Sequence, residues 1–358
     1  MIDAGPTPVG AEPAGTELLT AVTRGLIALA ATPPSTFRLP YPSSLQLALD
    51  RVVLDTISRR TPVPRSVPEL LSWCRERAPQ EWLALPRDFL NPDARLIHPA
   101  AGHPTRTCAE LASLGPYGVV EQEARSLLTR LSDSCGSPAR FAQCRDFLIR
   151  RPVLLRFDPM ELLQPSLAHT WRLVKDLYGP VPDGFPSDGL VHSCSGCGLL
   201  AKADTADGPW CEGGCAPEER KLDTSHQPRQ ARAVTLALRI FLALPGRTEL
   251  EVRARLGERS GSSATVLGIH RIPGPDGNPR TYQVQDREQP VPAALRAAEL
   301  AAGLDEQLDV VVPDVRAASP MYRQSFERAL PADAPVRLWS VGEFTADESA
   351  NRTWRDHA

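Results

Sequence analysis

The sequence of 358 residues has no apolar run that approaches the roughly 20 residues of a membrane-spanning helix. The longest candidate, residues 233–245, is short and contains Arg239. The first residues of the chain lack both the basic and the apolar segment of a secretion signal. We therefore expect a cytoplasmic protein without a membrane partner, whose cysteines are reduced or metal-bound rather than paired in disulfides.

The chain also lacks a strong excess of charge of either sign. It has 40 basic and 43 acidic residues, for a formal net charge of −3, and Lys175, Lys202 and Lys221 are its only lysines. This balance excludes a wholesale nucleic-acid coat, although a local basic surface is compatible with it. Apolar residues make up 42%, which suffices for a folded core, and the 36 prolines favour short elements over one long coiled coil.

Hydrophobic patterns predict a multidomain α + α/β protein. Residues 1–15 predict a flexible tail, and residues 16–180 follow a helical pattern that includes a capping box at Ser66–Glu69. Linkers are expected at 179–189 and about 216–229. Residues 230–345 alternate between helix and strand and predict a small mixed sheet flanked by helices, with a helix break at Pro245 and a tail at 346–358.

Two close cysteine pairs, at Cys194 and Cys197 and at Cys211 and Cys215, give the strongest chemical signal. Each pair can bind one side of a tetrahedral ion, and four thiolates without an open position indicate a structural Zn²⁺ in residues 190–217. Fe²⁺, metal-free cysteines and a replacement ligand at His192 are the weaker alternatives. Cys74, Cys108, Cys135 and Cys144 stand alone and are expected to be small core residues.

Five short motifs occur in an order that resembles one protein family. They lie at residues 106–110, 141–153, 194–198, 244–249 and 310–316. Together they resemble the restriction-endonuclease-like protein associated with prokaryotic PIWI-RE (pPIWI_RE) modules, over roughly residues 16–345. The resemblance implies a helical N-terminal region, a zinc ribbon with four cysteine ligands and a C-terminal restriction-endonuclease-like domain of the PD-(D/E)XK type. It also implies a PIWI-RE protein and a DinG-type helicase as partners in defence against invading DNA.

The resemblance further implies an eroded nuclease site. Glu249 keeps the helix position of the family, whereas Gln285 replaces a strand carboxylate and Arg287 replaces the lysine beside it. Residues 266–270 offer no aspartate for the first strand, and Asp276 falls in a turn. Since Mg²⁺ is usually held by carboxylates, this set predicts weak or absent hydrolysis. Asp286 is expected on the opposite face of the strand from Gln285, so it cannot replace Gln285 as a ligand unless the register shifts. For Glu249, a solvated carboxylate at the start of a helix is an equally good explanation.

Three functions remain open at this point. The first is an accessory subunit whose degenerate nuclease-like domain binds partner proteins, with DNA or an RNA–DNA hybrid as a further candidate ligand. The second is an active Mg²⁺-dependent DNA endonuclease, and the third is a zinc-ribbon DNA-binding regulator. No helix-turn-helix pattern in the sequence favours the third. Arg239, flanked by apolar residues, is expected to pack or pair internally.

Overall fold

The computed structural model describes residues 12–32, 39–115, 118–203, 205, 208–216, 218, 220–225, 227–257, 268–273, 279–304 and 306–355. The chain divides into two compact units, Met1–Gly118 and Val119–Ala358. Most of the tail predicted at 1–15 lies outside the described residues, as does the turn predicted at 274–278. Within the described part, no helix has the length and apolarity that a membrane span requires.

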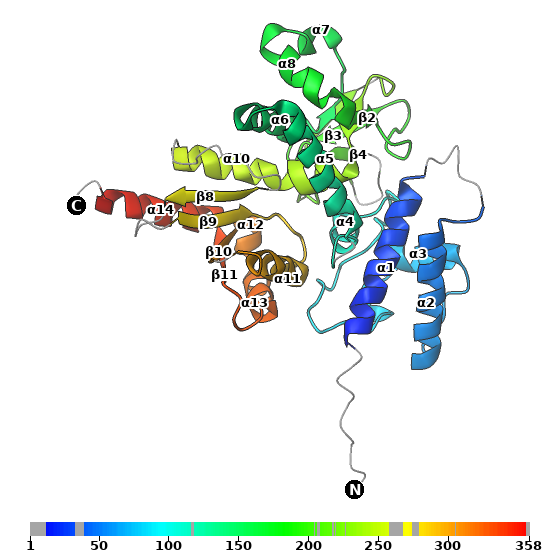
Figure 1. Cartoon of the computed structure of the whole chain (residues 1–358). Coiled ribbons are helices and arrows are strands. Elements are labelled where there is room, and N and C mark those ends of the chain that lie inside the picture. The colour runs from blue at the N-terminus through cyan, green and yellow to red at the C-terminus, as the bar shows by residue number, and fades with distance from the viewer. Residues whose placement is uncertain are drawn as a thin grey trace. The chain divides into compact units, whose positions relative to one another are not determined.

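The first unit is helical (Figure 1). Its elements are α1 (Glu12–Ala30), α2 (Ser43–Arg59), α3 (Val67–Glu76), the short η1 (Pro79–Glu81) and α4 (Arg106–Leu111). Apolar residues at helical spacing form its core, among them Leu19 and Val22 of α1 and Leu45 and Val52 of α2, all fully buried. Only half of the capping box is present: Ser66 Oγ accepts from the Glu69 N–H, but the Glu69 carboxylate accepts from the Arg65 N–H instead of the Ser66 N–H.

Gly25 of α1 sets how closely α1 approaches α2. A Cβ atom at this position would lie 2.7 Å from Leu45 Cα, which is backbone and cannot move aside. We expect Gly25→Ala to lower the free energy of unfolding by about 1–3 kcal/mol, because the two helices must separate. Urea unfolding measures the loss, and Glu17→Ala at a position of the same helix outside this contact is the control. Equal stability of both variants would contradict this packing.

Within its described residues, the second unit contains three sheets. The first joins β1 (Val153–Leu154), β7 (Arg232–Val234) and β2 (Tyr178–Pro180), with β7 in the centre and both pairings antiparallel. The second, called the four-cysteine sheet below, has the antiparallel order β5-β4-β3-β6. Its strands are β3 (Val191–Cys194), β4 (Leu200–Lys202), β5 (Trp210–Cys211) and β6 (Leu222–Ser225).

The third sheet is mixed and has the order β11-β10-β9-β8. Its strands are β8 (Ile269–Pro273), β9 (Pro279–Val284), β10 (Leu308–Val312) and β11 (Val336–Ser340). Only the β8/β9 pair of this sheet is antiparallel. This arrangement confirms the small mixed sheet that the sequence predicts.

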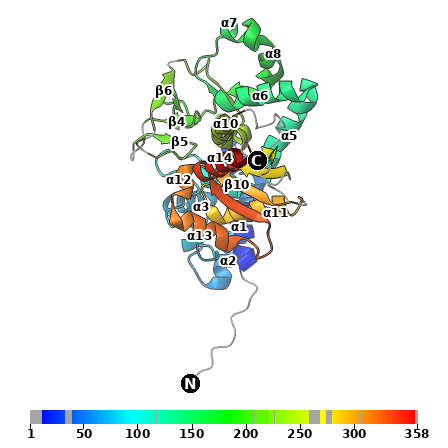
Figure 2. The same ribbon diagram turned by 90° about the vertical axis from the view of Figure 1, so that its left-hand side faces the viewer.

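Helices cover both faces of the mixed sheet (Figures 1 and 2). Side chains of β10 such as Val310 pack with α11 (Pro290–Ala301) and α13 (Pro320–Ala329). Tyr282 and Val311 face the other way, toward α10 (Leu244–Leu256) and α14 (Val341–Arg355). The short α12 (Asp314–Ala317) follows β10. Alternation along a strand therefore assigns each residue of β9 to one helical layer.

The remaining helices of the second unit precede or lead into these sheets. They are α5 (Val119–Cys135), α6 (Pro138–Arg150), α7 (Pro159–Leu162), α8 (Pro165–Val174), the short η2 (Lys175–Leu177), α9 (Leu236–Leu238) and the π-helical turn η4 (Arg239–Ala243). The helix break predicted at Pro245 is wrong, because α9, η4 and α10 are continuous in the chain. Pro245 lies in the first turn of α10, where a missing N–H is tolerated, directly after the π-helical turn.

Three predicted boundaries also differ from the structure. The helical region does not extend to residue 180 as one body, because α5 onward belongs to the second unit and β1 and β2 pair with β7. The linker predicted near 216–229 contains β6, which extends the four-cysteine sheet past residue 217. The tail predicted at 346–358 is helical to Arg355, and Arg280 holds it by ion pairs to Asp347 at 2.8 Å and Glu348 at 2.6 Å.

Candidate metal centre and nuclease-like site

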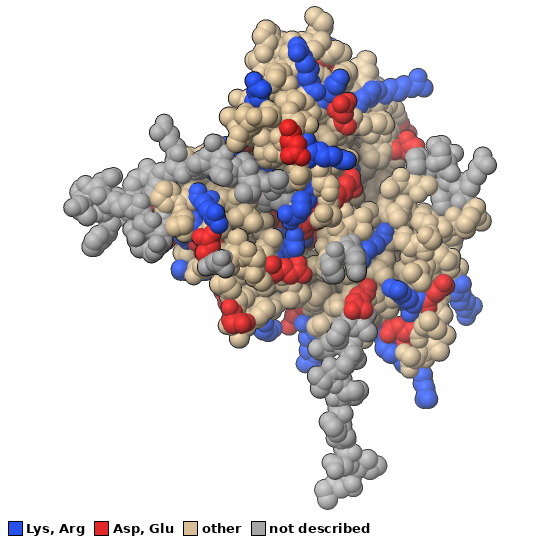
Figure 3. Space-filling view, in the orientation of Figure 1, with Lys and Arg blue, Asp and Glu red and all other residues tan. Residues whose placement is uncertain are grey.

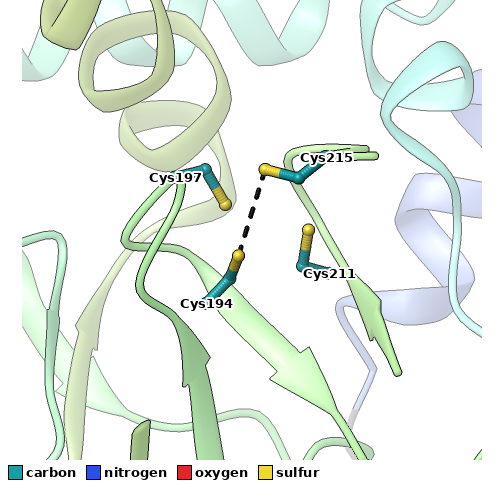
Figure 4. Close-up of side chains that lie close together, drawn as sticks. All are labelled: Cys194, Cys197, Cys211 and Cys215. Atoms are coloured by element: carbon teal, nitrogen blue, oxygen red, sulfur yellow. Dashed lines mark hydrogen bonds between the residues drawn. The ribbon is translucent and has the colours of Figure 1, made fainter. Parts of the chain in front are cut away.

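The four paired cysteines converge in the four-cysteine sheet (Figure 4). Their sulfur atoms all lie within 4.8 Å of one another, and Cys194 Sγ lies 3.9 Å from Cys215 Sγ. A tetrahedral ion with metal–sulfur bonds of about 2.3 Å separates its ligands by roughly 3.8 Å. The cluster therefore has the donors and the spacing to hold a metal ion.

Two tight turns bring these cysteines together. Cys194 ends β3 and Cys197 follows in the turn to β4, where Gly198 has a φ of +76°. Cys211 ends β5, and Gly214, with a φ of +65°, precedes Cys215. Both glycines occupy the left-handed region that side chains disfavour, so the sequence pattern and the backbone agree.

Sulfur–sulfur contacts shift the thiols away from their ordinary acidity. Hydrogen bonds from Cys197, Cys211 and Cys215 hold the pKa of Cys194 well below its usual range, whereas the same cluster raises the pKa of Cys197. The pKa of Cys211 is lowered as well and that of Cys215 is raised, because the four sulfur atoms share hydrogen bonds within the cluster. Metal ligation requires deprotonated thiols, so a bound cation would replace these sulfur–sulfur hydrogen bonds. His192 is not part of this cluster, since its Nδ1 lies 2.9 Å from Thr224 Oγ1.

A buried ion pair attaches the four-cysteine sheet to the helix that precedes the mixed sheet. Glu212, between the cysteines of the second pair, accepts from Arg239 Nε at 2.7 Å and from Arg239 Nη2 at 2.8 Å. Both side chains are almost fully buried. This bidentate contact confirms the internal pairing expected for Arg239, and it links the cysteine cluster to η4.

Glu249 is not a solvated carboxylate. It is 2% exposed on α10 and receives two hydrogen bonds of 2.5 Å each from Arg145 of α6. His270 Nε2 of β8 lies 3.3 Å from Glu249 Oε1. Burial alone would raise the pKa of Glu249, but the Arg145 guanidinium and His270 outweigh burial and hold this pKa well below its ordinary value.

Gly268 closes the backbone over this ion pair. Its φ is +69°, and a Cβ atom there would lie 3.0 Å from Glu249 Oε2 and 3.2 Å from Arg145 NH2. Arg145 therefore engages both carboxylate oxygens of Glu249 in a buried ion pair.

The side chains of Gln285 and Glu249 do not form a common site. The Gln285 amide donates to Gln283 Oε1 at 2.8 Å, and Gln283 pairs with Val310, which faces α11 and α13. His270 pairs with Tyr282 and faces the layer of α10. Strand alternation therefore places Gln285 and Glu249 on opposite faces of the mixed sheet.

Arg287 has a structural partner of its own. Its Nη2 donates to Glu121 Oε2 of α5 at 2.7 Å, and Glu121 also pairs with Arg296 of α11. Burial opposes ionisation of Glu121, yet the two arginines hold the pKa of this carboxyl below its ordinary value. Asp286 lies 3.7 Å from Arg316. Among the described residues, the only group of three or more acidic, histidine or cysteine ligands that could bind a metal is the cysteine cluster.

Sequence reasoning missed Arg145. It lies in the motif at 141–153, but nothing in that motif connects it with a glutamate 104 positions later. The lone cysteines, expected to be core residues, are all buried.

Comparison with known proteins gives one result. Residues 18–155 match the family model described as pPIWI_RE three-gene island domain Y. This match confirms the resemblance to proteins of pPIWI_RE modules and associates the chain with a pPIWI_RE system. The matched stretch runs from α1 to just after β1, before the four-cysteine sheet and the mixed sheet. No curated protein and no solved structure matches the chain at a significant level.

Proposed function

We propose that this chain is a non-hydrolytic accessory subunit of a pPIWI_RE-type defence system. In this proposal the mixed sheet with its helices is a degenerate PD-(D/E)XK-type domain that serves binding rather than cleavage. The four-cysteine site holds a structural Zn²⁺, and a PIWI-RE protein and a DinG-type helicase are the partners. The match of residues 18–155 supports the association with the island.

The bidentate pair of Arg145 and Glu249 carries the proposal of a non-hydrolytic subunit. Nucleases of this type need carboxylates that converge on Mg²⁺ and a lysine that orients water. Here the one retained carboxylate is neutralised by an arginine at 2.5 Å, and Gln285 belongs to the opposite face of the sheet. Arg287 is engaged by Glu121. The three residues therefore serve packing and ion pairing in separate places.

The Zn²⁺ proposal depends on the donor set. Four sulfur ligands in a closed cluster favour Zn²⁺ over harder cations, and no position remains for a substrate. When bound, the ion would be held by Cys194, Cys197, Cys211 and Cys215 and would fix the two turns of the four-cysteine sheet.

Two measurements test this function. The tagged full chain, co-expressed with the PIWI-RE protein and helicase of its own island, is expected to purify with at least one of them. The same chain, alone and in complex, is expected to leave duplex, single-stranded and R-loop DNA intact in Mg²⁺ or Mn²⁺. Metal-dependent cleavage that disappears in Glu249→Gln would replace this proposal with an endonuclease, and purification without either partner would reject the accessory role.

A further inference from the structure

Six elements of the second unit have the topology of a winged helix-turn-helix. In chain order they are α6, β1, α7, α8, β2 and β7, and their sheet has the order β1-β7-β2 with the last strand in the centre. A helix, a strand, two helices and two further strands paired in this way define that module, in which the second helix of the pair reads the major groove. The four-cysteine sheet lies between β2 and β7 in the chain, which is where a wing would be.

The pair α7–α8 is set by local signals. Asp158 caps α7 by accepting from the Met160 N–H at 2.9 Å, and Pro159 occupies the first turn. Two residues separate α7 from α8, and Pro165 occupies the first turn of α8, which has no side-chain cap. The connection is one or two residues shorter than the usual three- to four-residue turn of helix-turn-helix modules.

An aromatic cluster fixes the orientation of α8. Trp171 is buried, with ring centroids 6.4 Å from Phe147 of α6, 5.6 Å from Phe157 and 5.5 Å from Tyr178 of β2. Tyr178 OH donates to the Arg151 carbonyl at 2.5 Å. With Trp171 and Val174 turned inward, the opposite side of α8 is presented to solvent.

The outward side of α8 is polar and basic. Ser166, His169 and Arg172 recur every three residues along it, and all three are exposed. Lys175 follows directly after α8, and Arg156 lies in the loop before α7. In the described part of the chain, the side chains of Arg156, Arg172 and Lys175 have no hydrogen bond or ion pair, and all three are exposed.

The acidic residues nearby are mostly engaged elsewhere. Glu161 pairs with Arg151 at 3.1 Å, and Asp158 caps α7, which leaves Asp176 as an exposed carboxylate beside Lys175. Figure 3 shows several separate Lys and Arg side chains in the upper part of the molecule, where α7 and α8 lie in Figure 1, with Asp or Glu side chains beside them. The charge of this face complements a phosphate backbone.

We propose that α8 binds in the major groove of duplex DNA. Ser166 and His169, in its N-terminal half, face the base edges, while Arg156, Arg172 and Lys175 contact phosphates. Duplex DNA is favoured over an RNA–DNA hybrid because the major groove of an A-form duplex is too deep and narrow to admit a helix. This inference goes beyond the accessory function and does not depend on it, since it concerns a surface outside the mixed sheet.

The test measures binding of the full, metal-loaded chain to labelled duplex DNA of mixed sequence by fluorescence anisotropy. The variant Arg156→Ala/Arg172→Ala/Lys175→Ala is compared with the natural sequence from about 50 to 200 mM salt. The matched control, Arg65→Ala/Arg75→Ala/Arg87→Ala, removes equal charge at exposed positions of the first unit. A labelled RNA–DNA hybrid of the same sequence is the third arm.

We expect the α8 variant to bind duplex DNA at least about tenfold more weakly and with a log K versus log salt slope shallower by about 2 to 3. The control variant should keep both values, and the hybrid should bind more weakly than DNA. An unchanged slope in the α8 variant, equal binding of hybrid and DNA, or no binding by the natural sequence would each overturn the inference. The island association is tested separately by co-purification, so the two proposals fail independently.

Discussion

Replacing Cys197 by serine is expected to abolish metal binding and to destabilise the second unit. A purified natural chain should contain about one zinc ion, and the variant about none, because three thiolates and a hydroxyl form a poor tetrahedral site. Structural zinc sites contribute on the order of 10 kcal/mol of binding energy to folding, so the loss should be large. Elemental analysis gives the stoichiometry, and thermal unfolding gives the stability.

The four-cysteine sheet should not unfold alone. Glu212 and Arg239 are buried together, and a Cβ atom at Gly213 would lie 2.7 Å from Cys197 Sγ and 3.4 Å from Leu244 of α10. The cysteine turns are thus packed directly onto the helix that supports the mixed sheet. Cys135→Ala, which removes a buried thiol elsewhere in the same unit, is the control and should keep its metal. A full complement of metal in Cys197→Ser would show that this thiol is not a ligand.

The second large effect is expected from the Arg145–Glu249 pair. Arg145→Ala leaves a buried carboxylate without its partner, and we expect the free energy of unfolding to fall by about 3–5 kcal/mol. Arg145→Met combined with Glu249→Leu removes both charges and should recover most of this loss. Urea unfolding of the single and double variants measures the coupling.

A surface ion pair provides the comparison. Arg255 pairs with Glu251 at 2.5 Å on the same helix, but both side chains are about half exposed. Arg255→Ala should therefore cost no more than about 0.5 kcal/mol. If Arg145→Ala were as mild, the buried pair would have no structural role, and Glu249 would again be available as a metal ligand.

The pair also makes stability depend on pH. The pKa of Glu249 is depressed in the folded state, because the guanidinium outweighs the effect of burial. Its contribution is therefore complete above the unfolded pKa of about 4.3 and is lost as the pH falls through the lower folded pKa. Glu249→Gln should flatten the acid side of the stability curve.

Local signals in the sequence predict more of this protein than distant ones. Cysteine spacing, the glycines beside the cysteines and the N-cap at Ser66 all act within a few residues. The structure contains the cysteine cluster, the left-handed glycines and the cap. The mixed sheet is predictable because its strands and helices are long enough to show a period. The burial of the lone cysteines and the internal pairing of Arg239 follow from apolar neighbours.

Contacts between remote segments cannot be predicted in this way. The environment of Glu249 is set by Arg145 and His270, and neither is near it in sequence. The opposite orientation of Gln285 depends on strand register, which a short segment does not reveal. The three-stranded sheet around α7 and α8 could not be predicted from the sequence, because β1, β2 and β7 contain only two or three residues each and show no alternation.

The central position of β7 has a consequence for the order of assembly. β1 and β2 do not pair with each other, and only β7 connects them through Ala233, opposite Val153 and Gly179. During synthesis, β1 and β2 are therefore made first and the cysteine-bearing insertion next. The strand that pairs with both β1 and β2, β7, is made last. The three-stranded sheet can close only after the insertion with its four cysteines has been synthesised.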